Sequence, residues 1–321
     1  MKFLVFVLSL ISFSVSSSSV LVIESYHSEY DWDKSYIQGL ESSLSSDVEL
    51  ATFQMDTKRI PENEYEKMAD EAYQYYQKVR PSIVVLGDDN ALRYMYPKLY
   101  DEPISIVFLG VNSNPRSLLN KYQGAASVTG VLEQPLFVKT MADIGSMIAD
   151  DKRKIRIMFD SGITSQIAID YMKTQTQSIS NNLNIEIELL ALETLEQWHH
   201  SVENSAREEV SAIVVGLYHT IVDKQGSSVL ADEVLRWTNQ HSTVPLFGFW
   251  DFSIGGGKAA GGVVLFGELQ GQQAGELVMR ILGGELASMI PIQIGRKGRA
   301  VYHPAEMKRW GLTPPIHWNP M

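Results

Sequence analysis

Cysteine is absent from the 321-residue chain. Without thiols, the chain can form no disulfide and offers no thiolate metal ligand, no cysteine nucleophile and no N-terminal cysteine for lipid attachment. Positive charge is also scarce, because 27 Lys and Arg residues stand against 38 Asp and Glu residues and give a formal net charge of −11. This balance argues against nucleic acid or an anionic membrane surface as a partner.

Common catalytic and metal-binding motifs are missing from the sequence. There is no GxSxG nucleophile elbow and no GxxxxGK[ST] phosphate loop, and the 7 histidines form no HExxH pair. Gly255, Gly257 and Gly261 make a loose glycine pattern, but they lead into an apolar strand-like run instead of a helix. We therefore predict no metal, no cofactor and no enzymatic activity.

The N-terminus has the three parts of a secretory signal. Lys2 is basic, Phe3–Phe13 is almost entirely apolar, and small residues follow, with a cleavage point expected near Ser17–Ser19. An apolar run of about 11 residues is too short to cross a bilayer, which needs roughly 20. We predict a signal peptide over residues 1–18 and a soluble mature protein in the periplasm.

Short apolar runs alternate with amphipathic segments in the first part of the mature chain. Val20–Glu24 and Ile83–Leu86 are the kind of run found in strands that are buried on both faces of a parallel sheet. Between them, Tyr36, Leu40 and Leu44 recur at helical spacing. We predict a doubly wound α/β lobe with strands at 20–24, 50–55, 83–86 and 104–109.

The same alternation restarts further along the chain. A short extended stretch at 127–131 and a helix at 134–148 precede four more predicted strands, at 155–159, 185–190, 212–215 and 245–249. The amphipathic helix predicted at 268–282 cannot bury its apolar face alone, so we expect it to pack back on the first lobe. The fold class is therefore α/β, with two doubly wound Rossmann-like lobes that form a clamshell and bind a ligand in the cleft between them.

Polar and aromatic side chains follow most of the predicted strands. In open parallel sheets, ligands bind at the carboxyl ends of the strands, and aromatic walls with a few oriented polar groups suit a small organic ligand. From these positions, with Glu133 added as a further candidate cleft carboxylate, we predict the ligand-binding residues Tyr26, His27, Tyr30, Trp32, Asp88, Asp89, Asn90, Asn112, Glu133, Asp160, Tyr218, Trp250 and Asp251.

Several of these residues, and the nearby loop, also have a structural interpretation. Asp88 or Asp89 is equally suited to capping the helix that follows the third strand. A local ion pair between Asp56 and Arg59 is favoured over ligand contact by either residue. Asp251 could serve as a capping group at a hinge.

The aromatic positions leave the same choice open. Tyr26, Tyr30 and Trp32 fit core packing as well as ligand contact, and a lone His27 is more typical of a structural histidine. If these rings face the cleft, they could stack on a sugar or an aromatic ring or cage a cation. Since only Lys58–Arg59 would attract a strongly anionic ligand, we expect a small polar organic molecule that carries an amine or hydroxyl groups.

Six segments occur in the order found in one protein family: ESYHSEYDWDKSYIQGLE (24–41), DTKR (56–59), GDDNALRY (87–94), LGVN (109–112), TGVLE (129–133) and GFWDFSIGGG (248–257). Together they resemble the ABC-transporter substrate-binding-like proteins with a type 1 periplasmic-binding fold. Their close relatives include the extracytoplasmic sensing domains of histidine kinases and diguanylate cyclases. The similarity covers nearly the whole mature chain, although Glu24 stands where the pattern usually has Asn.

The resemblance implies an architecture of two lobes joined by three crossings. The crossings are expected near residues 113–127, 250–254 and 286–292. Lobe 1 should comprise residues 19–114 plus 253–287, and lobe 2 should comprise residues 115–252 plus 288–321.

The resemblance also implies a mode of action. A free-standing, monomeric receptor would close on a small-molecule ligand, and a membrane permease or a sensor kinase or cyclase would recognise the closed form. Uptake and sensing are not separable from the sequence. One alternative is an exported hydrolase that uses two cleft carboxylates with different pKa values. A protein-binding module is a third hypothesis and a weaker one, because it leaves the cleft without a use.

Overall fold

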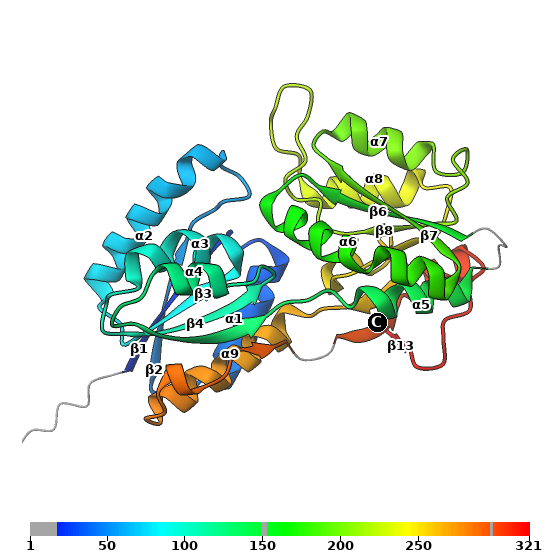
Figure 1. Ribbon diagram of the computed structural model, residues 1–321. Helices are drawn as coiled ribbons and strands as arrows, with labels where there is room; N and C mark the ends of the chain where they lie inside the picture. Colours follow the sequence, from blue (N-terminus) through cyan, green and yellow to red (C-terminus); the bar gives the residue numbers. More distant parts are fainter. Residues whose placement is uncertain (1–17, 149–152, 296–297) are drawn as a thin grey trace, which may run out of the picture.

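The computed structural model describes residues 18–148, 153–295 and 298–321 and shows two lobes side by side (Figure 1). The predicted signal peptide falls almost entirely on residues 1–17, which lie outside the described part. Within the described ranges, no helix combines the length and the apolar character needed to span a bilayer.

Lobe 1 is built on a six-stranded, fully parallel sheet. Its central strands are buried on both faces, as their continuous apolar sequences predict. In spatial order the strands are β11 (Gln293–Ile294), β5 (Ser127–Leu132), β4 (Ser105–Val111), β3 (Ile83–Gly87), β1 (Ser18–Glu24) and β2 (Val48–Gln54).

Helices cover both faces of this sheet. One face packs on α2 (Tyr65–Val79), which follows the short 3₁₀ turn η1 (Glu62–Glu64), and on α3 (Asp88–Leu99) and α4 (Arg116–Lys121). The other face packs on α1 (Asp31–Ser43) and α9 (Gly267–Leu282). A Cβ atom at Gly271 would overlap the carbonyl oxygen of Tyr36, so this close contact between α1 and α9 requires glycine. The prediction that the late helix returns to the first lobe is confirmed.

Lobe 2 contains a four-stranded parallel sheet and a small second sheet. The larger sheet has the order β7 (Ile185–Leu192), β6 (Arg153–Asp160), β8 (Ala212–Val215), β9 (Leu246–Gly248). Its helices are α5 (Phe137–Met147), α6 (Ile163–Leu183), α7 (Leu195–Glu203) and α8 (Ala231–His241). The small sheet joins β10 (Gly261–Val264), β12 (Arg299–Tyr302) and β13 (Asn319–Pro320), with α10 (Pro304–Arg309) beside it. Of its strands, the sequence indicated only the apolar run that forms β10.

The chain passes between the lobes at different points from those predicted. β5 lies in the segment predicted for lobe 2 but pairs with β4, and β11, also predicted for lobe 2, pairs with β5. β10 was predicted for lobe 1 but pairs with β12. The crossings therefore fall between β5 and α5, between β10 and α9, and between β11 and β12. The reason is that short strands carry no sequence signal for the sheet that they join. The edge strand β11, for example, is only Gln293–Ile294 and is preceded by the 3₁₀ turn η3 (Ala287–Met289).

Candidate functional site

The carboxyl ends of the two parallel sheets meet at a small cavity between the lobes. Its volume is about 20 Å³, close to the space of one water molecule. Side chains from both lobes line it: Tyr26, Thr57, Lys58, Tyr65 and Asn90 from lobe 1, and Asp160, Gly162, Ile163, Thr164, Ser165 and Thr220 from lobe 2. The cavity therefore lies where the strand-end rule places a ligand.

Direct contacts between the lobes explain why the cavity is small. The Tyr26 hydroxyl lies 2.9 Å from Thr164 Oγ1, and both side chains are buried. The Tyr30 ring meets the His219 ring edge-on, with 4.6 Å between the ring centroids. A solute larger than water can enter only when these contacts separate.

Asp160 organises the lobe 2 side of the cavity. Its Oδ2 accepts the backbone N–H groups of His219 at 2.7 Å and Thr220 at 3.0 Å. Its Oδ1 accepts the Ser165 hydroxyl at 2.5 Å and the Gly162 N–H at 3.1 Å. Both carboxylate oxygens are thus occupied within lobe 2, and they fix the loops after β6 and β8 around the cavity.

Asp88 and Asp89 lie behind the lobe 1 side. Asp88 Oδ1 accepts the Tyr26 hydroxyl at 2.8 Å and the Asp89 N–H at 2.8 Å. Asp89 accepts the N–H groups of Asn112 and Ser113, each at 3.0 Å. Burial, reinforced by the neighbouring charge of Asp89, raises the pKa of Asp88 to about 7. Gly87 occupies the N-cap position of α3, so neither aspartate is the N-cap residue, although Asp88 Oδ1 does accept one N–H group of the first turn, that of Asp89.

Asp88 also has an unusual backbone conformation. Its φ is +75°, in the left-handed region that non-glycine residues rarely adopt. Such strain is retained where the surrounding structure enforces it, and it concentrates at functional sites. Here it directs the Asp88 carboxyl beneath Tyr26.

The predicted aromatic residues occupy three different settings. Tyr26 lines the cavity. Tyr30 and Tyr218 do not line it, and both pack on His219, with the Tyr218 ring stacked at 4.5 Å. Trp32 is buried in the lobe 1 core and is not among the residues that line the cavity. His27 does not line it either; its Nδ1 lies 3.3 Å from Glu29 Oε2.

The remaining predicted residues lie near the crossings between the lobes. The indole N–H of Trp250, after β9, donates to Glu133 Oε1 at 2.7 Å, just after β5. Asn112 donates its side-chain amide to Gly110 O at 3.2 Å. Asp251 begins the 3₁₀ turn η2 (Asp251–Ser253), where burial raises its pKa to about 6. None of these residues is among those that line the cavity.

Sequence reasoning thus placed three predicted residues, Tyr26, Asn90 and Asp160, on the cavity wall. Lys58 was noted only as a group that would attract an anion and was not among the predicted ligand-binding residues. The prediction missed the other lining residues, which are Thr57, Tyr65, Gly162, Ile163, Thr164, Ser165 and Thr220. Thr164 and Ser165 open α6 directly after β6, so extending the strand-end rule by one helical turn would have found them. The favoured ion pair of Asp56 with Arg59 is confirmed, at 2.7 Å.

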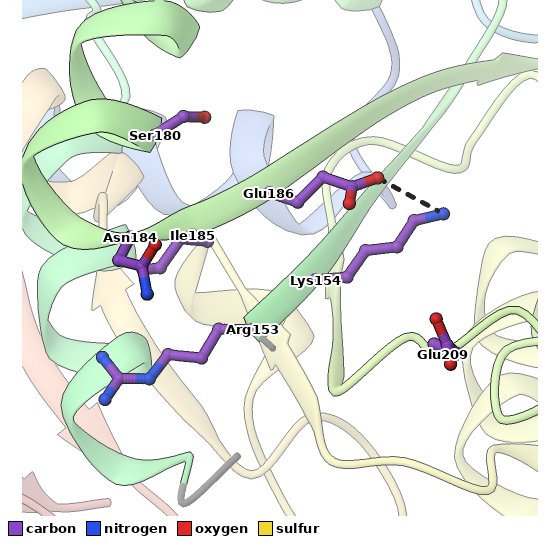
Figure 2. A pocket seen from close by; sticks show the side chains of 7 residues that line it. All are labelled: Arg153, Lys154, Ser180, Asn184, Ile185, Glu186 and Glu209. Carbon is purple, nitrogen blue, oxygen red and sulfur yellow. Dashed lines mark ion pairs between the residues drawn. The ribbon is translucent and has the colours of Figure 1, made fainter. Parts of the chain in front are cut away.

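A second hollow lies at the opposite end of the lobe 2 sheet (Figure 2). It measures about 280 Å³ and is lined by Arg153, Lys154, Ser180, Asn184, Ile185, Glu186 and Glu209. Lys154 Nζ lies 3.7 Å from Glu186 Oε1, as the dashed line in Figure 2 marks. This hollow sits where β6 and β7 begin, and it shares no residue with the cavity between the lobes. In the described part of the chain, no cluster of His, Asp and Glu is arranged to hold a metal ion.

A family model described as ABC transporter substrate binding protein matches residues 62–315, which is most of the chain. The chain belongs to this family. The predicted resemblance to the substrate-binding proteins is therefore confirmed. No curated protein sequence matches the chain.

Solved structures confirm the type 1 periplasmic-binding fold of this family member. An ABC domain from Streptococcus pneumoniae in complex with L-Trp is 14% identical, with a TM-score of 0.66 over 94% of this chain and 97% of that one. A conserved domain protein from Vibrio cholerae is 14% identical, with a TM-score of 0.68 over 95% and 99%. The ligand-free, open structure of a substrate binding protein from Clostridium difficile is 12% identical, with a TM-score of 0.59 over 95% and 99%.

Proposed function

We propose that this substrate-binding protein is a periplasmic receptor that closes its two lobes on a small polar organic solute. The observation that carries the proposal is the cavity between the lobes, which takes its wall from the strand ends of both. Two buried oxygens on that wall, Asn90 Oδ1 and Thr220 Oγ1, have no hydrogen-bond partner among the described residues. A bound solute that satisfied one oxygen in each lobe would favour the closed form.

The polar wall supports a small polar ligand. Tyr, Thr, Ser, Asn, Asp and Lys side chains surround the cavity, and Ile163 is its one aliphatic lining residue in the described chain. The similar structure from S. pneumoniae is described as a complex with L-Trp, and another similar structure as a sugar transporter from Clostridium phytofermentans. Such solutes exceed the present cavity, so binding must begin from separated lobes and end with closure.

The family name and the predicted signal peptide support export and a membrane partner. An ABC permease is the expected partner of a monomeric receptor of this family, and a sensor kinase or cyclase is the alternative. A permease and ATPase encoded beside this protein favour uptake, whereas an adjacent membrane kinase or cyclase favours sensing. Analytical ultracentrifugation of the mature protein should give a single species of monomer mass.

The protein should not transform its ligand. The alternative of an exported hydrolase draws on Asp88 and Asp251, whose raised pKa values suit a general acid. Asp88, however, is enclosed by Tyr26 and Asp89, and neither carboxyl lines the cavity. Neither group is therefore placed to contact a bound solute in this arrangement of the lobes.

A thermal-shift screen of amino acids, amines, sugars and nucleosides tests the proposal. A ligand present at 100 times its Kd should stabilise the protein by about 2.7 kcal/mol. Proton NMR of each ligand that binds should show it unchanged after prolonged incubation with the protein. Turnover that is lost in Asp88→Asn would establish the hydrolase instead, and a screen with no stabilising compound would contradict solute binding.

A further inference from the structure

Lys58 is a largely buried lysine whose ammonium group forms no ion pair within the described part of the chain. The residue is 9% exposed and lies on the wall of the cavity between the lobes. Its Nζ stands 4.1 Å from the centroid of the Tyr26 ring and 4.9 Å from that of Tyr30. Across the described part of the chain, no carboxylate oxygen lies within ion-pair distance of Nζ, and no side-chain or backbone oxygen accepts a hydrogen bond from it.

Ring faces alone do not satisfy such a group. An ammonium has three N–H donors, and a cation–π contact supplies electrostatic attraction without a lone pair to accept them. A buried charge is stable when it is paired and hydrogen-bonded, and it is costly otherwise. Lys58 therefore has N–H donors that a ligand in the cleft could engage.

The acidic residues around the cavity do not supply an acceptor for Lys58. Both oxygens of Asp160 are held by N–H and hydroxyl donors of lobe 2, and both oxygens of Asp89 accept backbone N–H groups. Asp88 accepts the Tyr26 hydroxyl and the Asp89 N–H through Oδ1. The nearby Lys58 charge partly offsets the rise in the Asp88 pKa, but the two groups do not come within ion-pair distance. None of the described residues accepts a hydrogen bond from Lys58, so a ligand in the cleft can supply that acceptor.

No other residue on this wall offers positive charge. Among the described lining residues, Lys58 is the single basic side chain. His219, which packs behind the wall, is held neutral because burial and the nearby Lys58 charge keep its pKa well below the usual range. An anionic group in the cleft would therefore be attracted to the Lys58 ammonium.

We propose that Lys58 is the anion-recognising residue of the cleft and that the solute is a small organic carboxylate. This inference rests on the proposed solute-binding function and narrows its ligand class. Asn90 Oδ1 and Thr220 Oγ1, which are buried without partners, accept an N–H or O–H group on the same molecule. A single carboxylate matches the single ammonium, whereas a phosphate dianion would leave excess negative charge beside the buried Asp88 and Asp89.

Acid and amide pairs test the ligand class. L-tryptophan with L-tryptophanamide, lactate with lactamide and benzoate with benzamide each differ mainly in the negative charge, and tryptamine, ribose and inorganic phosphate complete the panel. We expect stabilisation by one or more of the acids and at least tenfold weaker binding of the matching amide in calorimetry.

Lys58→Met, which keeps the length of the side chain and removes the charge, tests the residue. Acid binding should weaken about 10-fold or more, as expected for loss of a charged hydrogen bond. Lys34→Met, at an exposed position on α1, is the matched control and should bind like wild type. Without added ligand, Lys58→Met should still melt in one cooperative transition, which separates a loss of acid binding from a loss of folding.

Several results would overturn the assignment. One is equal binding of acids and amides. Another is tighter binding of tryptamine by Lys58→Met than by wild type, which would mean that a cationic ligand displaces Lys58 from the rings. Preference for phosphate would be another. A lower melting temperature of Lys58→Met with unchanged acid affinity would make Lys58 structural. If ribose or an amine binds while no acid does, the carboxylate class is wrong but solute binding stands; if no compound binds, the proposed function fails as well.

Discussion

The hydrogen bond between Tyr26 and Thr164 joins the two lobes, and its removal should shift the equilibrium between open and closed forms. The Tyr26 hydroxyl donates to Asp88 within lobe 1, so the Thr164 hydroxyl is the donor in the 2.9 Å contact across the cleft. Thr164→Val removes this donor and keeps the shape of the side chain. The contact to Asp88 stays in place in both forms.

The expected size follows from burial. Tyr26 is 2% exposed and Thr164 is 7% exposed, so water does not replace the lost bond in the closed form. A net hydrogen bond of this kind contributes about 1 kcal/mol, which corresponds to a roughly fivefold change in an equilibrium constant. In the open form both groups face water, so the substitution should have little effect there. Thr164→Val should lower the ratio of closed to open molecules about fivefold.

Single-molecule fluorescence energy transfer measures this ratio directly. Since the chain has no cysteine, the pair Lys67→Cys and Glu196→Cys would label exposed positions on α2 and α7 without competing thiols. Thr174→Val is the control, because its exposed hydroxyl bonds only to Tyr171 O within α6. An unchanged or larger closed population in Thr164→Val, with the control like wild type, would refute the view that this bond helps to hold the lobes together.

Three further predictions concern stability. Trp250→Phe should lower the free energy of unfolding by about 1–3 kcal/mol in urea titration, because it leaves the buried Glu133 without its indole donor. Gly271→Ala should lower the free energy of unfolding by more than about 2 kcal/mol, because the added methyl group would overlap the Tyr36 carbonyl. Glu276→Ala, at an exposed position on the same helix, should lower it far less. Burial raises the pKa of Glu24 from 4.5 to about 7, so the protonated acid favours the fold and stability is lost as pH rises from about 4.5 through 7. Glu24→Gln should reduce this pH-dependent decrease in the free energy of unfolding by about 1–3 kcal/mol. Glu49→Gln, at an exposed position, should leave the decrease unchanged.

The fold was largely predictable because buried parallel strands leave a continuous apolar run in the sequence. Val20–Glu24 and Ala212–Val215 were placed by this pattern, and both are buried central strands. The crossings were misplaced because β5 and β11 join the lobe 1 sheet through backbone hydrogen bonds, which depend little on residue type. Pairing partners of short strands are set by the assembled sheet and not by local sequence.

The cavity wall was only partly predictable for a related reason. Tyr26, Asn90 and Asp160 follow strands closely, so the strand-end rule reached them. Lys58 lies within a loop whose course depends on the ion pair between Asp56 and Arg59 and on the positive φ of Asp56, +54°. Thr220 was missed because the loop after β8 is set by its backbone bond to Asp160. Tertiary contacts of this kind determine where a side chain points, and they leave no pattern in the sequence.

The two sides of the cavity differ in a way that bears on closure. Lobe 2 presents Asp160 with both oxygens satisfied by its own loops. Lobe 1 presents Lys58, which packs on two rings and has no ion pair or hydrogen bond among the described residues. A ligand therefore gains little from Asp160 and most from the groups that lack partners, which are Lys58 and Asn90 in lobe 1 and Thr220 in lobe 2. A molecule that reaches Lys58 and Thr220 together makes contacts that neither lobe can provide alone. Because only the closed form brings these two residues to one cavity, such a molecule favours closure in proportion to its affinity for that form.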